Sequence, residues 1–174
     1  MPPHEQITES VFNIQLITMR SKKSFAEVTA EIESLFQPFD LEKLSNLAAK
    51  ADPQEFVSYA KQVDGTAGFG MFFQLDMGAL MRPGGIQHES KLYLIGSVIT
   101  GQGFFKYSGV AGLVAPVRFC VSKRDGEDTR IDIDRPSSID SQFPELSGSA
   151  VPAIKDAGML PLLAQVAGVS WPDA

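Results

Sequence analysis

The strongest constraint on the fold is a β-hairpin in the second half of the chain. Two runs of alternating apolar and polar residues, Val117–Lys123 and Thr129–Asp134, are joined by a short link that contains Asp125-Gly126. Both turn residues tolerate the positive φ that a tight hairpin turn requires. The two runs are therefore expected to be neighbouring strands, in a sheet that is at least partly antiparallel.

Three other segments have the composition and period of strands. Residues 11–19 alternate apolar and polar side chains, which predicts a half-buried first strand. Residues 68–76 alternate with the same period and place Met71 and Phe73 on one side, although the segment is apolar on nearly both sides. Residues 92–98 form a further apolar run. Together with the hairpin, these segments predict five strands.

Helix start signals lie between the first two strands. Ser24 and Glu27 form a capping box, in which the serine side chain accepts from the third helical amide and the glutamate reaches back to the cap. Asp40 and Asp52 are expected to cap two further helices, and Pro53 fits the first turn of the second one. These signals predict one amphipathic helix after the first strand and two more before the second.

The C-terminal part of the chain is also helical in pattern. Residues 151–169 are rich in apolar side chains, and Pro161 is expected to divide them into two short helices. Exposing these side chains together would leave an aggregation-prone surface. We therefore expect this segment to pack on the domain or on a second subunit.

Composition and charge exclude several classes of function. A single α+β domain over residues 1–174 is expected, because 44% hydrophobic and 21% charged residues suit one sizeable core. A formal net charge of −6, with scattered basic residues, argues against nucleic-acid binding. The apolar runs fall short of the roughly 20 residues of a membrane helix, so no membrane partner is expected. Cys120 is the only cysteine, which fits the reducing cytoplasm.

Glycines at 96, 101 and 103 raise the question of a phosphate-binding loop. Gly96 and Gly101 have the spacing of a Walker A motif, but Gln102 and Gly103 stand where the motif requires Lys followed by Ser or Thr. The dinucleotide fingerprint also fails, because Lys106 replaces its third glycine. We expect no nucleotide and no other cofactor.

Three segments carry a family resemblance: RSKKSF at residues 20–25, RPGGIQHESKLYLIGS at 82–97, and VAPVRFCVSKRDGEDTRIDIDRPS at 114–137. They resemble the uncharacterised family numbered 302 among the domains of unknown function. In that family a strand ends in Gly-Asn-Pro and a Leu-Pro leads into a hairpin. Here Gly96 is kept, Ser97 and Val98 replace Asn-Pro, and Ala115-Pro116 resembles the Leu-Pro.

The resemblance implies a fold but no established active site. It implies a single antiparallel, curved β-sheet with helices packed on one face, in the TATA-binding-protein-like class, which also includes helix-grip ligand binders. The core is then expected at about residues 11–136. Because the 37–67 region is longer than the family norm and the tail is an addition, extra helices are expected there and over residues 150–170.

Aromatic and ionisable residues suggest a ligand site. A curved sheet gripped by helices leaves space for a cavity, and aromatic side chains are available to line it as ligand-binding residues: Phe72, Phe104 and Phe105. The alternative is that these rings simply fill the core. Arg82 and Arg118 are expected to supply cationic contacts to the ligand.

Three residues are candidates for catalysis. His88 beside Glu89 has the chemistry of a general acid or base, and its alternative is a solvated loop histidine. Tyr107 with Lys106 is able to stabilise a developing enolate or phenolate. The alternative is that Lys106 is simply solvated and Tyr107 is half buried. No second histidine stands at metal-ligand spacing, so no metal is expected.

Two functions from different classes remain. The first is a small-molecule-binding domain with an apolar or aromatic pocket, whose enzymatic form is a cofactor-independent lyase, isomerase or cyclase using acid-base side chains. The second is a non-catalytic interaction module that forms a homo-oligomer through a sheet edge or the C-terminal segment.

Overall fold

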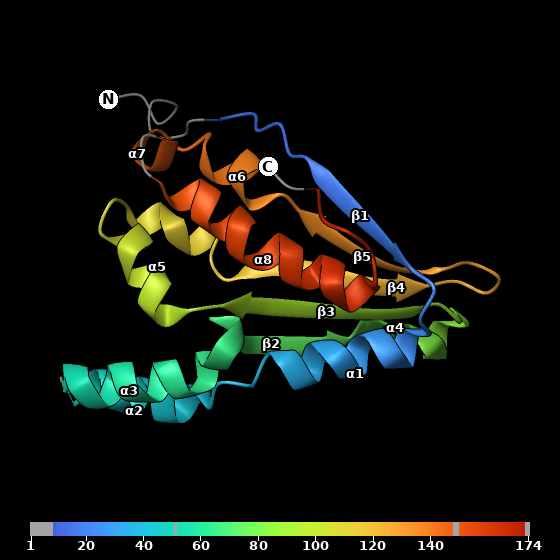
Figure 1. The fold of residues 1–174 in the computed structure, drawn as a ribbon, viewed down its shortest axis with the longest axis horizontal. Coiled ribbons are helices and arrows are strands. Elements are labelled where there is room, and N and C mark those ends of the chain that lie inside the picture. Colours follow the sequence, from blue (N-terminus) through green and yellow to red (C-terminus); the bar gives the residue numbers. More distant parts are fainter. Residues whose placement is uncertain (1–8, 51, 148–149, 173–174) are drawn as a thin grey trace.

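The computed structural model describes residues 9–50, 52–147 and 150–172 and is built on a five-stranded sheet (Figure 1). Its strands are β1 (Leu16–Ser21), β2 (Gly70–Asp76), β3 (Glu89–Gly96), β4 (Val117–Lys123) and β5 (Thr129–Asp134). They are arranged in the order β1-β5-β4-β3-β2, and every neighbouring pair is antiparallel. The expected α+β class is confirmed.

Helices connect and cover the strands. The α-helices are α1 (Phe25–Leu35), α2 (Leu41–Ala49), α3 (Pro53–Asp64), α4 (Met77–Met81), α5 (Val98–Phe105), α6 (Pro136–Asp140), α7 (Pro144–Ser147) and α8 (Val151–Ala167). Short 3₁₀ helices are η2 (Gly65–Ala67), η3 (Arg82–Gly84) and η4 (Gly109–Leu113). The additional helices expected before β2 are therefore α2 and α3.

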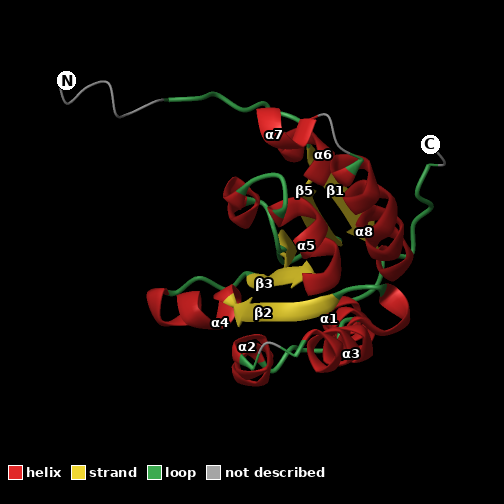
Figure 2. Ribbon diagram, turned by 90° about the vertical axis from the view of Figure 1, so that its left-hand side faces the viewer, coloured by secondary structure: helices red, strands yellow, loops and turns green. Residues whose placement is uncertain are grey.

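Helices α1 and α8 lie side by side on one face of the sheet (Figures 1 and 2). Strand residues that alternate along β3, β4 and β5 point to this face, and their side chains are at most 2% exposed: Tyr93, Ile95, Phe119, Val121, Ile131 and Ile133. Ile32 and Phe36 from α1 and Leu160 and Leu163 from α8 complete the core. The C-terminal segment therefore packs on the domain, as its composition predicts.

The predicted helix caps are confirmed. Ser24 Oγ accepts from Glu27 N at 3.2 Å, and the Glu27 carboxylate accepts from Ser24 N at 2.7 Å, which closes the capping box of α1. Asp40 and Asp52 cap α2 and α3 through their side chains. Local hydrogen bonding thus fixes these helix starts, which is why the sequence alone identifies them.

The first strand is shorter than predicted. β1 begins at Leu16, where it pairs with Asp134 of β5. The residues before it lie outside the strand, and two of their amides donate to side chains: Asn13 N to Gln142 Oε1 and Gln15 N to Ser138 Oγ. Because β5 ends at Asp134, no strand is available to pair with them, and the expected strand over residues 11–19 is wrong in its first half.

Strand β2 contains a register shift that its alternation does not reveal. Met71 pairs with Ile95 on the helix-covered face, but Phe73 pairs with Leu94, which points to the other face. One extra residue, Phe72, is accommodated between them, as in a β-bulge. The expectation that Met71 and Phe73 share one side is therefore wrong.

Two further boundaries differ from the sequence prediction. β3 runs over Glu89–Gly96 rather than residues 92–98, because Ser97 leaves the strand to cap α5. The C-terminal segment is one continuous helix, α8, with Pro161 inside it. Pro161 and Ala157, whose carbonyl loses its helical partner, are both exposed, so water is able to satisfy that carbonyl.

Candidate functional site

An apolar pocket of about 450 Å³ lies beyond the end of β3, between α5 and α8. We call it the aromatic pocket. It is lined by Phe56, Phe69, Phe72, Gly96, Ser97, Val98, Thr100, Gly101, Gln102, Phe104, Phe105, Ala115, Pro116, Val117, Ile154, Lys155 and Gly158. These residues come from segments far apart in the sequence, which the sheet brings to one end of the molecule.

Hydrogen bonds at Ser97 fix the wall formed by α5. Ser97 Oγ accepts from Thr100 N at 3.3 Å and donates to Asp64 Oδ2 at 2.6 Å. The first bond begins α5 where β3 ends, and the second ties it to the last residue of α3. The aromatic pocket is therefore framed by anchored elements rather than by a free loop.

Two features of the backbone create the space and its aromatic lining. The bulge in β2 falls at Phe72, and a bulge redirects side chains relative to regular alternation. A Cβ atom at Gly101 would have no heavy atom within 4 Å, so this glycine leaves open volume beside the pocket. Gly101 and Gly103 lie inside α5, which means that they form no glycine loop.

Lys155 provides the one ionisable side chain among the residues that line the aromatic pocket. Its ammonium lies 2.8 Å from Asp140 Oδ2, donates to the Val114 carbonyl at 3.1 Å, and sits 4.8 Å from the Phe104 ring centroid. The lysine and aspartate side chains are 5% and 1% exposed. A paired cation is thus held in an apolar wall.

Burial raises the pKa of two carboxyl groups beside the aromatic pocket. Burial raises the pKa of Asp140 above its ordinary value, although the ion pair with Lys155 opposes the shift. Burial also raises the pKa of Asp64, and the hydrogen bond from Ser97 opposes it. Within the described residues, Asp64 Oδ1 has no hydrogen-bond partner. Both groups therefore carry a desolvation cost when they are ionised.

The sequence prediction found part of this lining. Phe72, Phe104 and Phe105 all line the aromatic pocket, with Phe104 buried and Phe105 51% exposed. Sequence reasoning misses Lys155, because the apolar side chains of α8 predict only that the helix packs on the domain or on a second subunit. The available signal is the single lysine of a mainly apolar helix, one residue after Ile154.

The predicted polar residues do not join these aromatic residues. Lys106 and Tyr107 follow α5 and are exposed, with the ammonium 4.8 Å from the centroid of the tyrosine ring. Arg118 lies on the opposite face of the sheet and pairs with Asp134 at 3.0 Å. These side chains are absent from the lining of the aromatic pocket.

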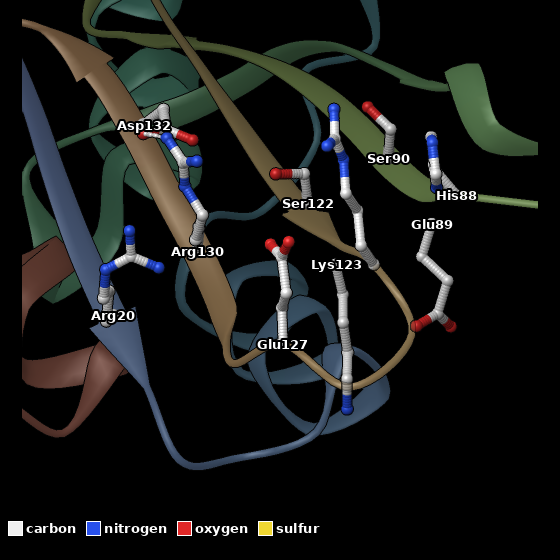
Figure 3. A pocket seen from close by; sticks show the side chains of 10 residues that line it. Arg20, His88, Glu89, Ser90, Ser122, Lys123, Glu127, Arg130 and Asp132 are labelled. Atoms are coloured by element: carbon white, nitrogen blue, oxygen red, sulfur yellow. Dashed lines mark hydrogen bonds and ion pairs between the residues drawn. The ribbon is translucent and has the colours of Figure 1, made fainter.

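Arg82 and His88 lie near the other end of β3. Arg82 is exposed in η3, and His88 lines a separate hollow of about 670 Å³. We call this second cavity the polar hollow, lined by Arg20, His88, Glu89, Ser90, Ser122, Lys123, Arg124, Glu127, Arg130 and Asp132 (Figure 3). The structure therefore separates His88 from Tyr107 and Lys106, and their catalytic roles stay predictions.

Among residues 9–50, 52–147 and 150–172, no group of three or more His, Cys, Asp or Glu side chains is arranged to hold a metal ion. None of the helices that the structure describes is long and apolar enough to cross a membrane.

The fold belongs to the α+β class: it is an antiparallel sheet with helices α1 and α8 on one face. Among solved structures, the chain is similar to the crystal structure of an uncharacterized conserved protein, DUF302, from Bacillus stearothermophilus. The match has a TM-score of 0.55 at 13% sequence identity and covers 88% of this chain and 95% of that chain. This likeness of fold supports the family resemblance found in the sequence. No protein-family model matches the chain, and no curated protein matches it.

Proposed function

We propose that the aromatic pocket binds a small organic molecule that is largely apolar or aromatic and carries one oxygen acceptor. The observation that carries the proposal is the combination of a phenylalanine-rich cavity of about 450 Å³ with a single buried cation, Lys155. Ligand pockets in proteins are commonly apolar cavities with a few placed polar groups that orient the ligand.

Lys155 determines how the ligand is oriented in the aromatic pocket. Its ammonium has three donors, of which Asp140 and the Val114 carbonyl engage two. A carboxylate or carbonyl oxygen is the natural partner of the third, and charge-assisted hydrogen bonds are strong in an apolar surrounding. The ligand therefore presents its rings to Phe72 and Phe104 and its oxygen to Lys155.

An enzymatic form of the proposal uses the same geometry. In a cofactor-independent lyase, isomerase or cyclase, Lys155 would stabilise negative charge that develops on the ligand oxygen. The pocket lining includes no other ionisable side chain. Binding is therefore the primary function, and a reaction would depend on this lysine rather than on His88 or Tyr107.

Paired ligands test the proposal. Naphthoate and naphthalene methanol have the same rings but differ in whether the oxygen group is charged. Calorimetric titration is expected to show saturable binding of both, with naphthoate bound about tenfold more tightly because of its charge-assisted bond to Lys155. Absence of saturable binding for either compound would contradict the proposal.

Self-association is the second candidate, and one observation favours it. The edge strand β2 and the segment after it expose four large apolar side chains, each between 45% and 56%: Phe73, Leu80, Met81 and Ile86. The outer edge of β2 is bonded at Met71, through the backbone of Gln37 and Phe39. Exposed apolar groups beside the rest of an edge strand are typical of an association surface. Light scattering over a range of concentrations tests this candidate, and a constant monomer mass would remove it.

A further inference from the structure

The polar hollow lies on the sheet face opposite α1 and α8, where four strands present a row of polar side chains. The sheet register pairs Arg20 of β1 with Arg130 of β5, Arg130 with Ser122 of β4, and Ser122 with Ser90 of β3. Figure 3 shows these four side chains on the same side of the sheet, with His88 beside Ser90. Register alone therefore places two guanidinium groups and two hydroxyls along one line.

The two guanidinium groups are not fully neutralised. The side chain of Arg20 forms no hydrogen bond or ion pair with any residue that the structure describes. Arg130 Nη2 donates to Asp132 Oδ1 at 2.7 Å, but its buried Nε has no hydrogen-bond partner among the described residues. Like charges directly opposite each other on paired strands are unfavourable. This arrangement is unexpected in a chain with a net charge of −6.

We propose that the polar hollow binds the phosphate group of a small molecule, with Arg20 and Arg130 as the main contacts. An anion between the two arginines removes their repulsion and satisfies the free donors. Guanidinium groups bind phosphate in bidentate fashion, and a tetrahedral oxyanion has enough acceptor oxygens to engage hydroxyls as well. Ser90 and Ser122 supply those hydroxyl donors.

Acidic residues at the polar hollow limit the negative charge that a ligand can carry. Asp132 is already engaged, because its Oδ1 also accepts from Thr18 Oγ1 at 2.5 Å. Figure 3 shows Glu89 and Lys123 directed away from the row, whereas Glu127 points toward it. Glu127 forms no salt bridge in the described part of the chain. Its negative charge disfavours an extended polyanion and favours a ligand with a single phosphate group.

Titration of the full chain with inorganic phosphate tests the site. We expect saturable binding below roughly 10 mM in calorimetry or in amide chemical shifts, since several charge-assisted bonds form. Arg20→Gln is expected to weaken binding about tenfold, because it removes a cation that has no structural partner. Glu127→Gln is expected to tighten binding severalfold by removing a nearby negative charge.

The matched control is Arg118→Gln, which removes an arginine from the same sheet face but outside the hollow. Its phosphate affinity is expected to equal that of the parent protein. Phenyl phosphate binding more tightly than inorganic phosphate would identify a phosphorylated organic ligand, and equal affinity would identify free phosphate. The proposal is overturned by absence of saturation, by equal losses in the two arginine variants, or by acetate binding as tightly as phosphate.

Discussion

The ammonium of Lys155 lies 2.8 Å from the carboxylate of Asp140, and the two side chains are only 5% and 1% exposed. This ion pair joins α8 to α6 at the wall of the aromatic pocket. Removing two charges from water costs free energy, which their attraction and the Val114 carbonyl offset. The cation that is proposed to bind the ligand is therefore also part of the structure.

Breaking this pair is expected to destabilise the protein. Lys155→Met leaves a buried carboxylate without its partner and should lower the free energy of unfolding by about 3–5 kcal/mol. The double variant Lys155→Met/Asp140→Leu should recover much of the loss, because it leaves no unpaired charge. Denaturant unfolding of both variants measures the difference.

Lys22→Met is the matched control for that experiment. Lys22 also pairs with an aspartate at 2.7 Å, but its side chain is 89% exposed and that of Asp128 is 36% exposed. Solvent screens such pairs strongly, so little change in stability is expected. Equal losses in the Lys22 and Lys155 variants would show that burial of the pair has no energetic role.

Asp64 gives the stability a predictable pH dependence. Burial raises its folded-state pKa above the ordinary 3.8, so the protonated carboxyl stabilises the fold at low pH. This contribution is lost as the pH rises through the folded-state pKa. The Asp64→Asn variant lacks this titration, so its stability relative to the parent should increase as the pH rises from the ordinary value of 3.8 through the folded-state pKa. A difference that is constant with pH would contradict the prediction.

The role of α8 in the core is testable by truncating one side chain. Leu163 is fully buried against the sheet, and Leu163→Ala should cost about 2–5 kcal/mol by creating a cavity. Leu113 is 80% exposed, and Leu113→Ala serves as the control with a change within about 0.5 kcal/mol. Thermal unfolding that ranks the two variants in the opposite order would exclude this packing.

Pro161 is expected to weaken the helix that contains it. It removes one helical hydrogen bond at an exposed position of α8, so Pro161→Ala should restore that bond. The expected gain is about 1–2 kcal/mol, since the freer unfolded chain offsets part of it. A decrease in melting temperature would show that the proline fits its site better than alanine does.

Local signals explain how much of the fold the sequence predicts. The hairpin of β4 and β5 was placed correctly because alternation and the Asp-Gly turn act within a few residues. The start of α1 was correct because Ser24 and Glu27 satisfy each other. The bulge at Phe72 was missed because it depends on pairing with β3 rather than on its own neighbours.

The candidate site was harder to predict for a related reason. Phe72 and Phe104 lie together because β2 and α5 meet at one end of the sheet, which no local pattern reveals. Lys155 comes from a helix whose apolar composition suggested only packing. The polar hollow likewise depends on the register of Arg20 with Arg130, residues separated by most of the chain.

Filling the aromatic pocket tests the central claim most directly. Gly101 lines the pocket and has open space around its Cα, whereas Gly103 lies in the same helix, has similar space, and does not line the pocket. Both Gly101→Leu and Gly103→Leu should fold, because leucine is more favourable than glycine within a helix. Calorimetric titration with naphthoate is predicted to show at least about tenfold weaker binding for Gly101→Leu and unchanged binding for Gly103→Leu. Equal affinity in the parent and both variants would contradict the assignment of the ligand to this pocket.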